Sequence, residues 1–110
     1  MMLEVGTHSF HGLPISEQQW KFLKTIDLFI QINGWMPSYG ELINLQVASK
    51  SSCQRWLPFF EDQGYIKRAT GFRNGVVTDK GKQLIYEGEM LHRRWEAYRT
   101  AVLATKDKYV

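Results

Sequence analysis

Cysteine and long apolar runs are scarce in this 110-residue chain, and each scarcity excludes a class of protein. The single cysteine, Cys53, cannot form an internal disulfide, and we expect the chain in a reducing cytoplasm. No apolar stretch approaches the roughly 18 residues of a membrane-spanning helix, and we expect neither a membrane span nor a secretory signal. A hydrophobic fraction of 44% still predicts one globular core with an appended element.

Patterns that carry catalysis or bind metal are also missing. The sequence shows no carboxylate pair, no nucleophile at a suitable distance from a base, and no glycine loop that would cradle phosphate. His8 and His11 are three residues apart, but only one remote cysteine accompanies them. We therefore expect no enzyme, no metal site and no cofactor.

Positive charge is concentrated in the middle third of the chain. Residues 1–49 carry two basic and four acidic side chains, whereas residues 50–82 carry seven basic and three acidic ones. A surface that binds phosphates would therefore lie in this middle segment. A chance excess of lysine and arginine on a solvated face is the alternative interpretation.

Capping signals divide the first third of the chain. Residues 1–14 show no period, and we expect an extended N-terminal arm there. Ser16 precedes Gln19 by three residues, the spacing of a capping box, and Gly34 ends the apolar periodicity that follows. The pattern predicts a helix of about 17 residues whose wide apolar stripe packs on the core and in part on the C-terminal helix.

A second capping box begins at Ser38. Glu41 lies three residues after it, and the pair opens a short helix that extends to about Leu45. We expect Leu42 and Leu45 to face inward from this helix.

A third helix and two strands complete the predicted domain. Ser49 caps a helix that runs to about Gln63, and Gly64 ends it. The segments 65–68 and 75–78 are typical of short strands joined by a loop. Three helices followed by a hairpin predict a mainly helical winged helix-turn-helix domain over residues 15–78.

Short motifs in a fixed order carry a family resemblance over residues 15–78. They are the apolar-Ser16-x-x-Gln19 opening, Asn33-Gly34-Trp35-Met36-Pro37-Ser38, Glu41-Leu42, the serine-rich start of the third helix, Gly64-Tyr65-Ile66-Lys67-Arg68, and Gly75-Val76-Val77. This series resembles the N-terminal DNA-binding domain of the LexA repressor. The following Thr78-Asp79-Lys80-Gly81-Lys82, which leads into a helix, is more similar to MarR- and PadR-like winged-helix regulators.

The sequence departs from the LexA pattern at three places. The connection before the third helix is one residue shorter, and Gln46 stands where a glycine is usual. Pro58 falls inside the third helix, so we expect a kink between Gln54 and Pro58. Nothing after residue 78 resembles the LexA peptidase, so the resemblance does not imply self-cleavage.

The third helix is the predicted recognition helix, which reads base edges in the major groove with its first turns. Cys53, Leu57 and Phe60 are spaced to form its buried stripe. A glutamine on the outer face can pair with adenine and an arginine with guanine, while hydroxyls and wing residues suit phosphates. The predicted DNA-binding residues are Ser38, Lys50, Ser51, Ser52, Gln54, Arg55, Lys67, Arg68, Arg73 and Asn74.

Residues 79–110 are predicted to form a C-terminal helix that serves as a dimerisation element. Apolar residues recur there at spacings of seven, four, three and four, which resembles a coiled-coil seam. A homodimer would place two recognition helices on a palindromic site, and a helix folded back on its own domain is the alternative. The predicted interface residues are Leu84, Leu91, Trp95, Tyr98 and Val102.

Two functions follow from these patterns. The first is a sequence-specific regulator of transcription that binds double-stranded DNA, acting as a dimeric repressor. The second is a winged-helix factor that binds protein, such as a small phage or mobile-element protein docking on host machinery. In the second case Trp35, Trp56 and Phe59 would make the contact surface, and the basic patch would be incidental.

Overall fold

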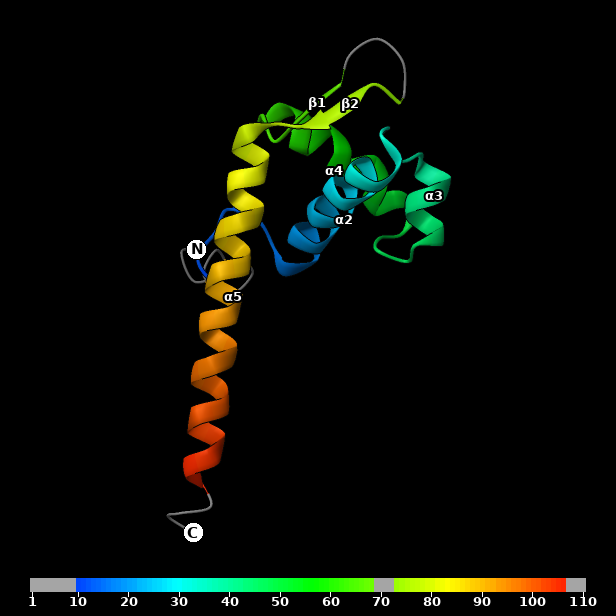
Figure 1. The fold of residues 1–110 in the computed structure, drawn as a ribbon. Coiled ribbons are helices and arrows are strands. Elements are labelled where there is room, and N and C mark those ends of the chain that lie inside the picture. Colours follow the sequence, from blue (N-terminus) through cyan, green and yellow to red (C-terminus); the bar gives the residue numbers. More distant parts are fainter. Residues whose placement is uncertain (1–9, 69–72, 107–110) are drawn as a thin grey trace, which may run out of the picture.

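A computed structural model describes residues 10–68 and 73–106 of the chain (Figure 1). The elements follow in the order α2 (Glu17–Asn33), α3 (Tyr39–Asn44), α4 (Lys50–Asp62), β1 (Ile66–Arg68), β2 (Gly75–Val77) and α5 (Asp79–Lys106). Three helices gather beneath a two-stranded hairpin, and α5 extends away from them as a single long helix (Figure 1). This arrangement confirms the predicted fold class, which is mainly helical with a small hairpin and a long C-terminal helix.

Both predicted capping boxes are present. The backbone N–H of Gln19 donates to Ser16 Oγ at 3.1 Å, and the Gln19 side chain accepts from the backbone N–H of Ser16 at 2.9 Å. Ser38 and Glu41 repeat this exchange at 3.0 and 2.8 Å. Each box satisfies amide donors that a helix start otherwise leaves without partners. Gly34, at φ 85°, ends α2 as predicted.

Leu45 contradicts the prediction that it faces inward. It follows the last residue of α3 and is 49% exposed, whereas Leu42 is fully buried. The reason is that Gln46 takes a left-handed conformation at φ 59°, which turns the chain one residue after Leu45. Gln46 thus adopts the conformation for which a glycine is usual at this position.

The third predicted helix begins at its predicted cap, where Ser49 Oγ accepts from the backbone N–H of Ser52 at 3.1 Å. Pro58 lies inside α4 without ending it, on the exposed face of the helix. Because Gln54 is exposed one turn earlier, the carbonyl that Pro58 leaves without a helical donor is on the solvated side. The kink expected between these residues stays a prediction.

Residues 10–14, the described part of the predicted extended arm, form a turn. Residues 1–9 lie outside the described part of the chain, but residues 10–15 form a turn in which the Phe10 N–H donates to the Ile15 carbonyl at 2.8 Å. Phe10 is 6% exposed, and its ring centroid lies 4.7 Å from that of Trp20. Phe10 and Ile15 at the two ends of this turn therefore contribute to the core.

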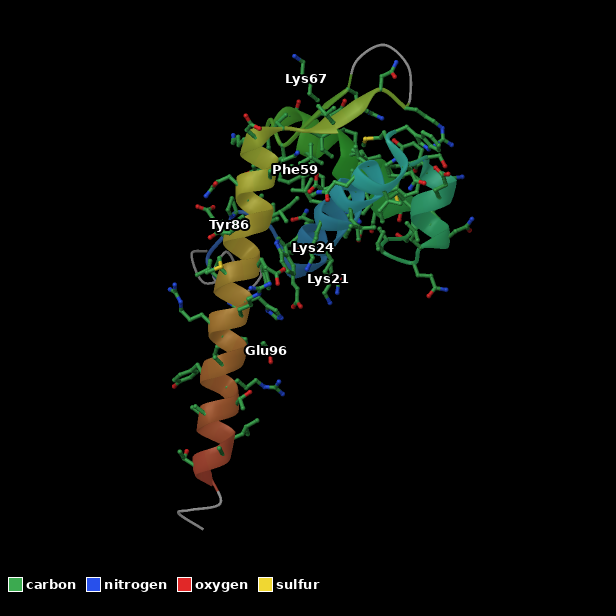
Figure 2. All side chains as sticks on the ribbon, in the orientation of Figure 1. Lys21, Lys24, Phe59, Lys67, Tyr86 and Glu96 are labelled. Carbon is green, nitrogen blue, oxygen red and sulfur yellow. The ribbon has the colours of Figure 1, made fainter. Side chains whose placement is uncertain are left out.

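The hairpin pairs Ile66 with Val77 and Arg68 with Gly75 in antiparallel register. Ile66 and Val77 point into the core, while Lys67 points away from the helices (Figure 2). The hairpin thus closes one side of the core with its apolar face. The largest fully buried side chains are Phe22, Phe60, Leu23, Ile26, Met36, Leu42, Ile66 and Cys53.

Two glycines bring α5 into close contact with the rest of the fold. A Cβ at Gly81 would lie 2.3 Å from the Tyr65 carbonyl oxygen, and one at Gly88 would lie 2.2 Å from Trp20 Nε1. Trp20 is 3% exposed, and its Nε1 donates to the Ile85 carbonyl at 3.2 Å. The first half of α5 is therefore part of the folded core.

Candidate nucleic-acid interface

The two sides of α4 differ as the sequence predicted. Cys53, Leu57 and Phe60 are at most 2% exposed, which confirms the buried stripe. Burial raises the pKa of the Cys53 thiol, which favours the protonated form and fits a core residue better than a nucleophile. Four of the predicted DNA-binding residues are exposed on the opposite side and Ser52 is half-buried there; the exposed four are Lys50, Ser51, Gln54 and Arg55.

Hydroxyl groups gather at the first turn of α4. Ser49 Oγ lies 3.3 Å from Ser51 Oγ and donates to Ser52 Oγ at 3.1 Å. Arg55 Nη2 donates to Ser52 Oγ at 3.3 Å, which orients the guanidinium along the helix toward the same end. Helix N-termini carry partial positive charge, so this turn presents hydroxyl donors and cationic side chains to an approaching phosphate. Ser49 was predicted as a cap only, and its place in the hydroxyl cluster was missed.

The hairpin presents one exposed lysine and one arginine with an intrachain partner. Lys67 is exposed in the middle of β1. The guanidinium of Arg68 instead donates to both carboxylate oxygens of Glu61 on α4, each at 2.8 Å. These hydrogen bonds lower the pKa of the Glu61 carboxyl and raise that of Arg68, so both groups carry charge.

Arg73 has partners on the segment around α3. Its Nη1 lies 3.2 Å from Glu41 Oε1 and 3.5 Å from the Met36 carbonyl, and its guanidinium lies 5.8 Å from the centre of the Trp35 ring. Glu41 is also the capping residue of Ser38, and the backbone hydrogen bond from Ser38 is the main cause that lowers the pKa of its carboxyl. The hydroxyl of Ser38, a predicted DNA contact, is likewise used within this cap.

The cationic side chains among the predicted DNA-binding residues divide into those with an ion-pair partner and those without one in the described part of the chain. Among residues 10–68 and 73–106, the ion pairs include Arg68 and Arg73 but not Lys50, Arg55 or Lys67. Asn74, the last predicted wing residue, is exposed. The predicted DNA-binding residues that combine exposure with an uncompensated charge thus lie on α4 and in the middle of β1.

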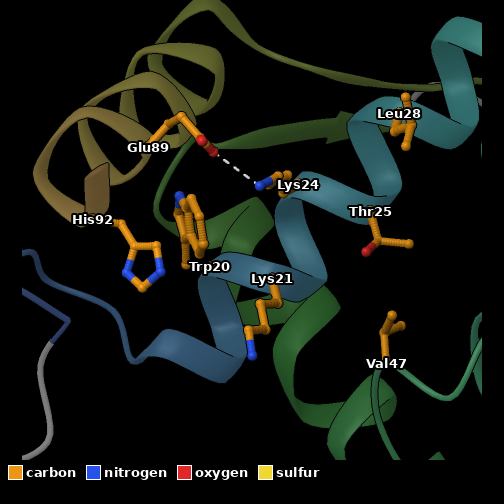
Figure 3. Close-up of a pocket in the computed structure, with 8 residues that line it drawn as sticks. All are labelled: Trp20, Lys21, Lys24, Thr25, Leu28, Val47, Glu89 and His92. Carbon is orange, nitrogen blue, oxygen red and sulfur yellow. Dashed lines mark hydrogen bonds and ion pairs between the residues drawn. The ribbon is translucent and has the colours of Figure 1, made fainter. Parts of the chain in front are cut away.

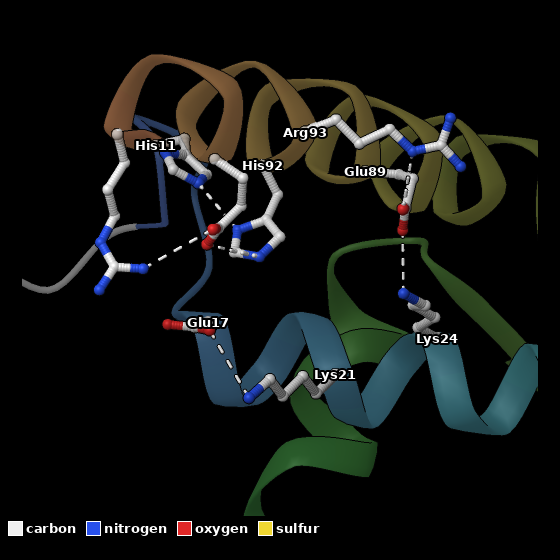
Figure 4. Close-up of polar contacts among 9 residues, drawn as sticks. His11, Glu17, Lys21, Lys24, Glu89, His92 and Arg93 are labelled. Atoms are coloured by element: carbon white, nitrogen blue, oxygen red, sulfur yellow. Dashed lines mark hydrogen bonds and ion pairs between the residues drawn. The ribbon is translucent and has the colours of Figure 1, made fainter. Parts of the chain in front are cut away.

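Polar contacts also join α5 to α2 (Figure 4). Lys24 Nζ lies 2.9 Å from Glu89 Oε1, and this hydrogen bond lowers the pKa of the Glu89 carboxyl. Arg93 reaches the other oxygen of Glu89 at 3.2 Å. Nearby, His11 Nε2 lies 3.5 Å from His92 Nδ1. The described residues contain no group of three or more side chains that could hold a metal ion.

A hollow of about 390 Å³ opens beside these contacts (Figure 3). Trp20 and Lys24 line it from α2, Glu89 and His92 from α5, and Val47 from the turn before α4. The hollow thus touches the turn that positions the predicted recognition helix. The remaining lining residues are Lys21, Thr25 and Leu28.

The predicted interface residues of α5 separate into two groups. Leu84 is 5% exposed in the core, so the prediction that it serves a dimer interface is corrected: its side chain is covered by its own domain. Leu91 is half-buried. Trp95, Tyr98 and Val102 are 47%, 62% and 47% exposed on the part of α5 that extends beyond the domain. The fold-back interpretation therefore holds for the first half of α5, and the dimer interface stays a prediction for the exposed half.

Of the three aromatic residues predicted for a protein-docking surface, one is exposed and two are half-buried. Trp56 and Phe59 are half-buried and pack against the core, where the Trp56 ring meets Phe22 edge-on at 5.3 Å. Trp35 is 46% exposed.

Of the helices in the described part of the chain, none combines the length and apolarity needed to cross a membrane.

Comparison with known proteins supports the fold. No protein-family model and no curated protein matches the sequence. The chain is similar to the solved structure of NadR in complex with 4-hydroxyphenylacetate, with a TM-score of 0.57 and 25% sequence identity over 86% of this chain and 73% of that one. NadR is a winged-helix regulator of the MarR family, whereas the resemblance to LexA stays a prediction. The chain has the fold of a winged-helix regulator.

Proposed function

We propose that the chain is a sequence-specific regulator of transcription that binds double-stranded DNA through α4 and the hairpin. Its structural neighbour NadR is a DNA-binding transcriptional regulator, which supports this role. We further propose that the chain acts as a dimer and represses by occupying a promoter.

One observation carries the proposal: the outer face of α4 is exposed, polar and cationic. Lys50 and Arg55 are exposed there and take part in none of the ion pairs among the described residues. A face that only met solvent would gain from partner carboxylates, whereas a face that meets phosphates keeps its cations uncompensated.

Each residue of this face has a role in the proposal. Gln54 pairs with an adenine and Arg55 with a guanine in the major groove. Ser51 and Ser52 contact phosphates at the helix N-terminus, where the helix dipole favours an anion. Lys67 on the hairpin contacts the DNA backbone beside the groove.

The dimer is proposed on the exposed half of α5. Trp95, Tyr98 and Val102 follow each other at spacings of three and four, so they share one helix face. Large apolar side chains that stay exposed on one face commonly mark an association surface. A two-fold dimer would present two copies of α4 to a palindromic site.

A small aromatic acid is the proposed effector class. NadR was solved in complex with 4-hydroxyphenylacetate, which is such an acid. The hollow between α2 and α5 is lined by the indole of Trp20, against which a ring could pack, and by Lys21 and Lys24. The ammonium groups of these lysines lie 3.6 and 2.9 Å from carboxylates of the chain, and a ligand carboxylate would have to replace those partners. A rise in melting temperature with 4-hydroxyphenylacetate, lost in Lys24→Gln, is the expected result; an unchanged melting temperature at millimolar ligand would contradict it.

The protein-docking alternative predicts different behaviour. A docking factor would bind duplex DNA weakly or not at all, and its affinity would not depend on phosphate contacts. We therefore propose measuring affinity for a random duplex between about 50 and 200 mM salt, followed by selection of bound oligonucleotides from a random pool. A steep loss of affinity with salt supports DNA binding, and no binding at low salt excludes it.

Arg55 offers the sharpest single-residue test. Arg55→Gln should weaken binding to the selected site by about 5- to 150-fold, since a bidentate arginine–guanine pair discriminates by roughly 1–3 kcal/mol. Binding to a random duplex should fall much less. Arg94→Gln is the matched control, because Arg94 is exposed on α5 and joins none of the ion pairs of the described residues. Equal losses on both duplexes would make Arg55 a phosphate contact.

A further inference from the structure

Two arginines that flank the tip of the hairpin are held by carboxylates of the helices. Arg68, the last residue of β1, makes a two-pronged hydrogen bond to Glu61 near the end of α4, with both distances 2.8 Å. The two side chains are 26% and 31% exposed, so the pair is shielded from solvent in part. Arg73, two residues before β2, lies 3.2 Å from Glu41 of α3.

These pairs change the charge that the hairpin presents. Lys67, Arg68 and Arg73 are the cationic side chains of β1, β2 and residues 73–74 in the described part of the chain. Glu61 and Glu41 each compensate one arginine, which leaves Lys67 as the uncompensated cation of this group. A wing with three uncompensated cations would attract any duplex, because each phosphate contact adds affinity that does not depend on sequence.

We propose that Glu61 and Glu41 are positioning residues that hold Arg68 and Arg73 away from DNA phosphates and so limit sequence-independent binding. This inference rests on the proposed DNA-binding function. It assigns the two arginines a role within the chain, in place of the DNA contacts expected from the sequence. Base reading then rests on α4, with Lys67 as the hairpin's phosphate contact.

The geometry favours the carboxylate over a phosphate as the partner of Arg68. Both carboxylate oxygens of Glu61 are matched by guanidinium N–H groups in a fixed fork, and such bidentate pairs are among the strongest polar contacts. A DNA phosphate would have to displace Glu61 and leave its carboxylate near the negatively charged duplex. Removing the negative charge of Glu61 while keeping its shape should therefore release Arg68 to the DNA.

The test uses the full chain with Glu61→Gln, Glu41→Gln and Arg68→Gln, and it measures affinity for a random duplex over a range of salt. Glutamine is also a capping-box residue, so Glu41→Gln retains the cap of Ser38. Glu87→Gln is the control, since it removes the same charge from an exposed residue of α5 with no ion pair among the described residues. Circular dichroism and melting temperature establish that each variant is folded.

We expect Glu61→Gln to tighten random-duplex binding about fivefold to tenfold near 0.1 M salt and to steepen the logarithmic salt slope by about 0.9, the effect of one added phosphate contact. Glu41→Gln should act in the same direction, and Glu87→Gln should leave the slope unchanged. Arg68→Gln should leave the slope of the parent protein unchanged, and adding it to Glu61→Gln should restore the parent slope.

The outcomes separate this inference from the proposed function. If the parent binds duplex DNA but Glu61→Gln leaves its slope unchanged, or Arg68→Gln makes the slope shallower, the inference is overturned while the function stands. If the parent binds no duplex even at low salt, the proposed function is overturned and this inference with it.

Discussion

Gly88→Ala tests the packing of α5 on the rest of the fold. An added Cβ would lie 2.2 Å from Trp20 Nε1 and 2.6 Å from Cδ1, so the helix or the indole must move by roughly an ångström to reach ordinary contact. Trp20 is 3% exposed in the core and has little room to give. The same movement would stretch the hydrogen bond of 3.2 Å from Nε1 to the Ile85 carbonyl.

Three contributions determine how much Gly88→Ala lowers the free energy of unfolding. Overpacking a filled core costs about 1–3 kcal/mol, and a buried N–H that loses its acceptor costs about 1–3 kcal/mol more. The higher helix propensity of alanine offsets about 1 kcal/mol. We therefore expect Gly88→Ala to lower the free energy of unfolding by about 1–5 kcal/mol, with a melting temperature lower by roughly 5–20 °C.

Urea denaturation followed by tryptophan fluorescence and circular dichroism measures this change. Gly40→Ala on α3 is the matched control, because the nearest atom to its added Cβ is Ser38 Oγ at 3.8 Å. That variant should be as stable as the parent or slightly more stable. In a Trp20→Phe background the penalty of Gly88→Ala should shrink, since the five-membered ring that the Cβ meets is gone. An undiminished stability of Gly88→Ala would refute the close approach of α5 to Trp20.

Two further predictions concern α5. Trp95→Ala combined with Tyr98→Ala should convert the proposed dimer to a monomer without lowering the helix content, as measured by sedimentation and circular dichroism; a parent protein that is already monomeric would contradict the proposal. The pKa of Glu89 is lowered below its ordinary value of 4.5 by the Lys24 hydrogen bond, so the pair stabilises the fold above that pH and ceases to do so as the pH falls through the lowered value. The Glu89→Gln variant should therefore be less stable than the parent at pH 7, by under about 1 kcal/mol for this largely exposed pair. The urea midpoints of the two proteins should converge as the pH falls. A difference between the midpoints that stays constant with pH would refute a stabilising Lys24–Glu89 pair.

The elements of the fold were predictable because their signals are local. Ser16, Ser38 and Ser49 each cap a helix within three residues along the chain, and Gly34 and Gly64 end helices by their own left-handed backbone. The apolar spacing within α4 alone distinguishes its buried side from its exposed side. Such interactions do not depend on how the elements pack together.

What the sequence could not show depends on contacts between distant segments. Glycine lowers helix propensity, yet Gly81 and Gly88 lie where α5 approaches Tyr65 and Trp20 closely. No pattern predicts that Arg73 meets Glu41, which lies 32 residues earlier, because only the packed fold brings the hairpin to α3. The exposure of the candidate residues on α4 could accordingly be predicted, whereas the ion pairs of the hairpin arginines could not, and DNA contact stays a prediction for both.

The junction between β2 and α5 links these parts into one unit. Thr78 is the single residue between them, and its Oγ1 donates to the Gly64 carbonyl at 2.6 Å and accepts the Gly81 N–H at 3.1 Å. The end of α4, the hairpin and the start of α5 are thus tied to one side chain. From Asp79 to Trp95 an α-helix rises about 24 Å, at roughly 1.5 Å per residue. In a dimer joined through Trp95, a rigid helix without a flexible linker would set the distance between the two copies of α4. The proposed operator must then have one fixed half-site spacing, close to a whole number of DNA turns, because α5 could not adjust to another.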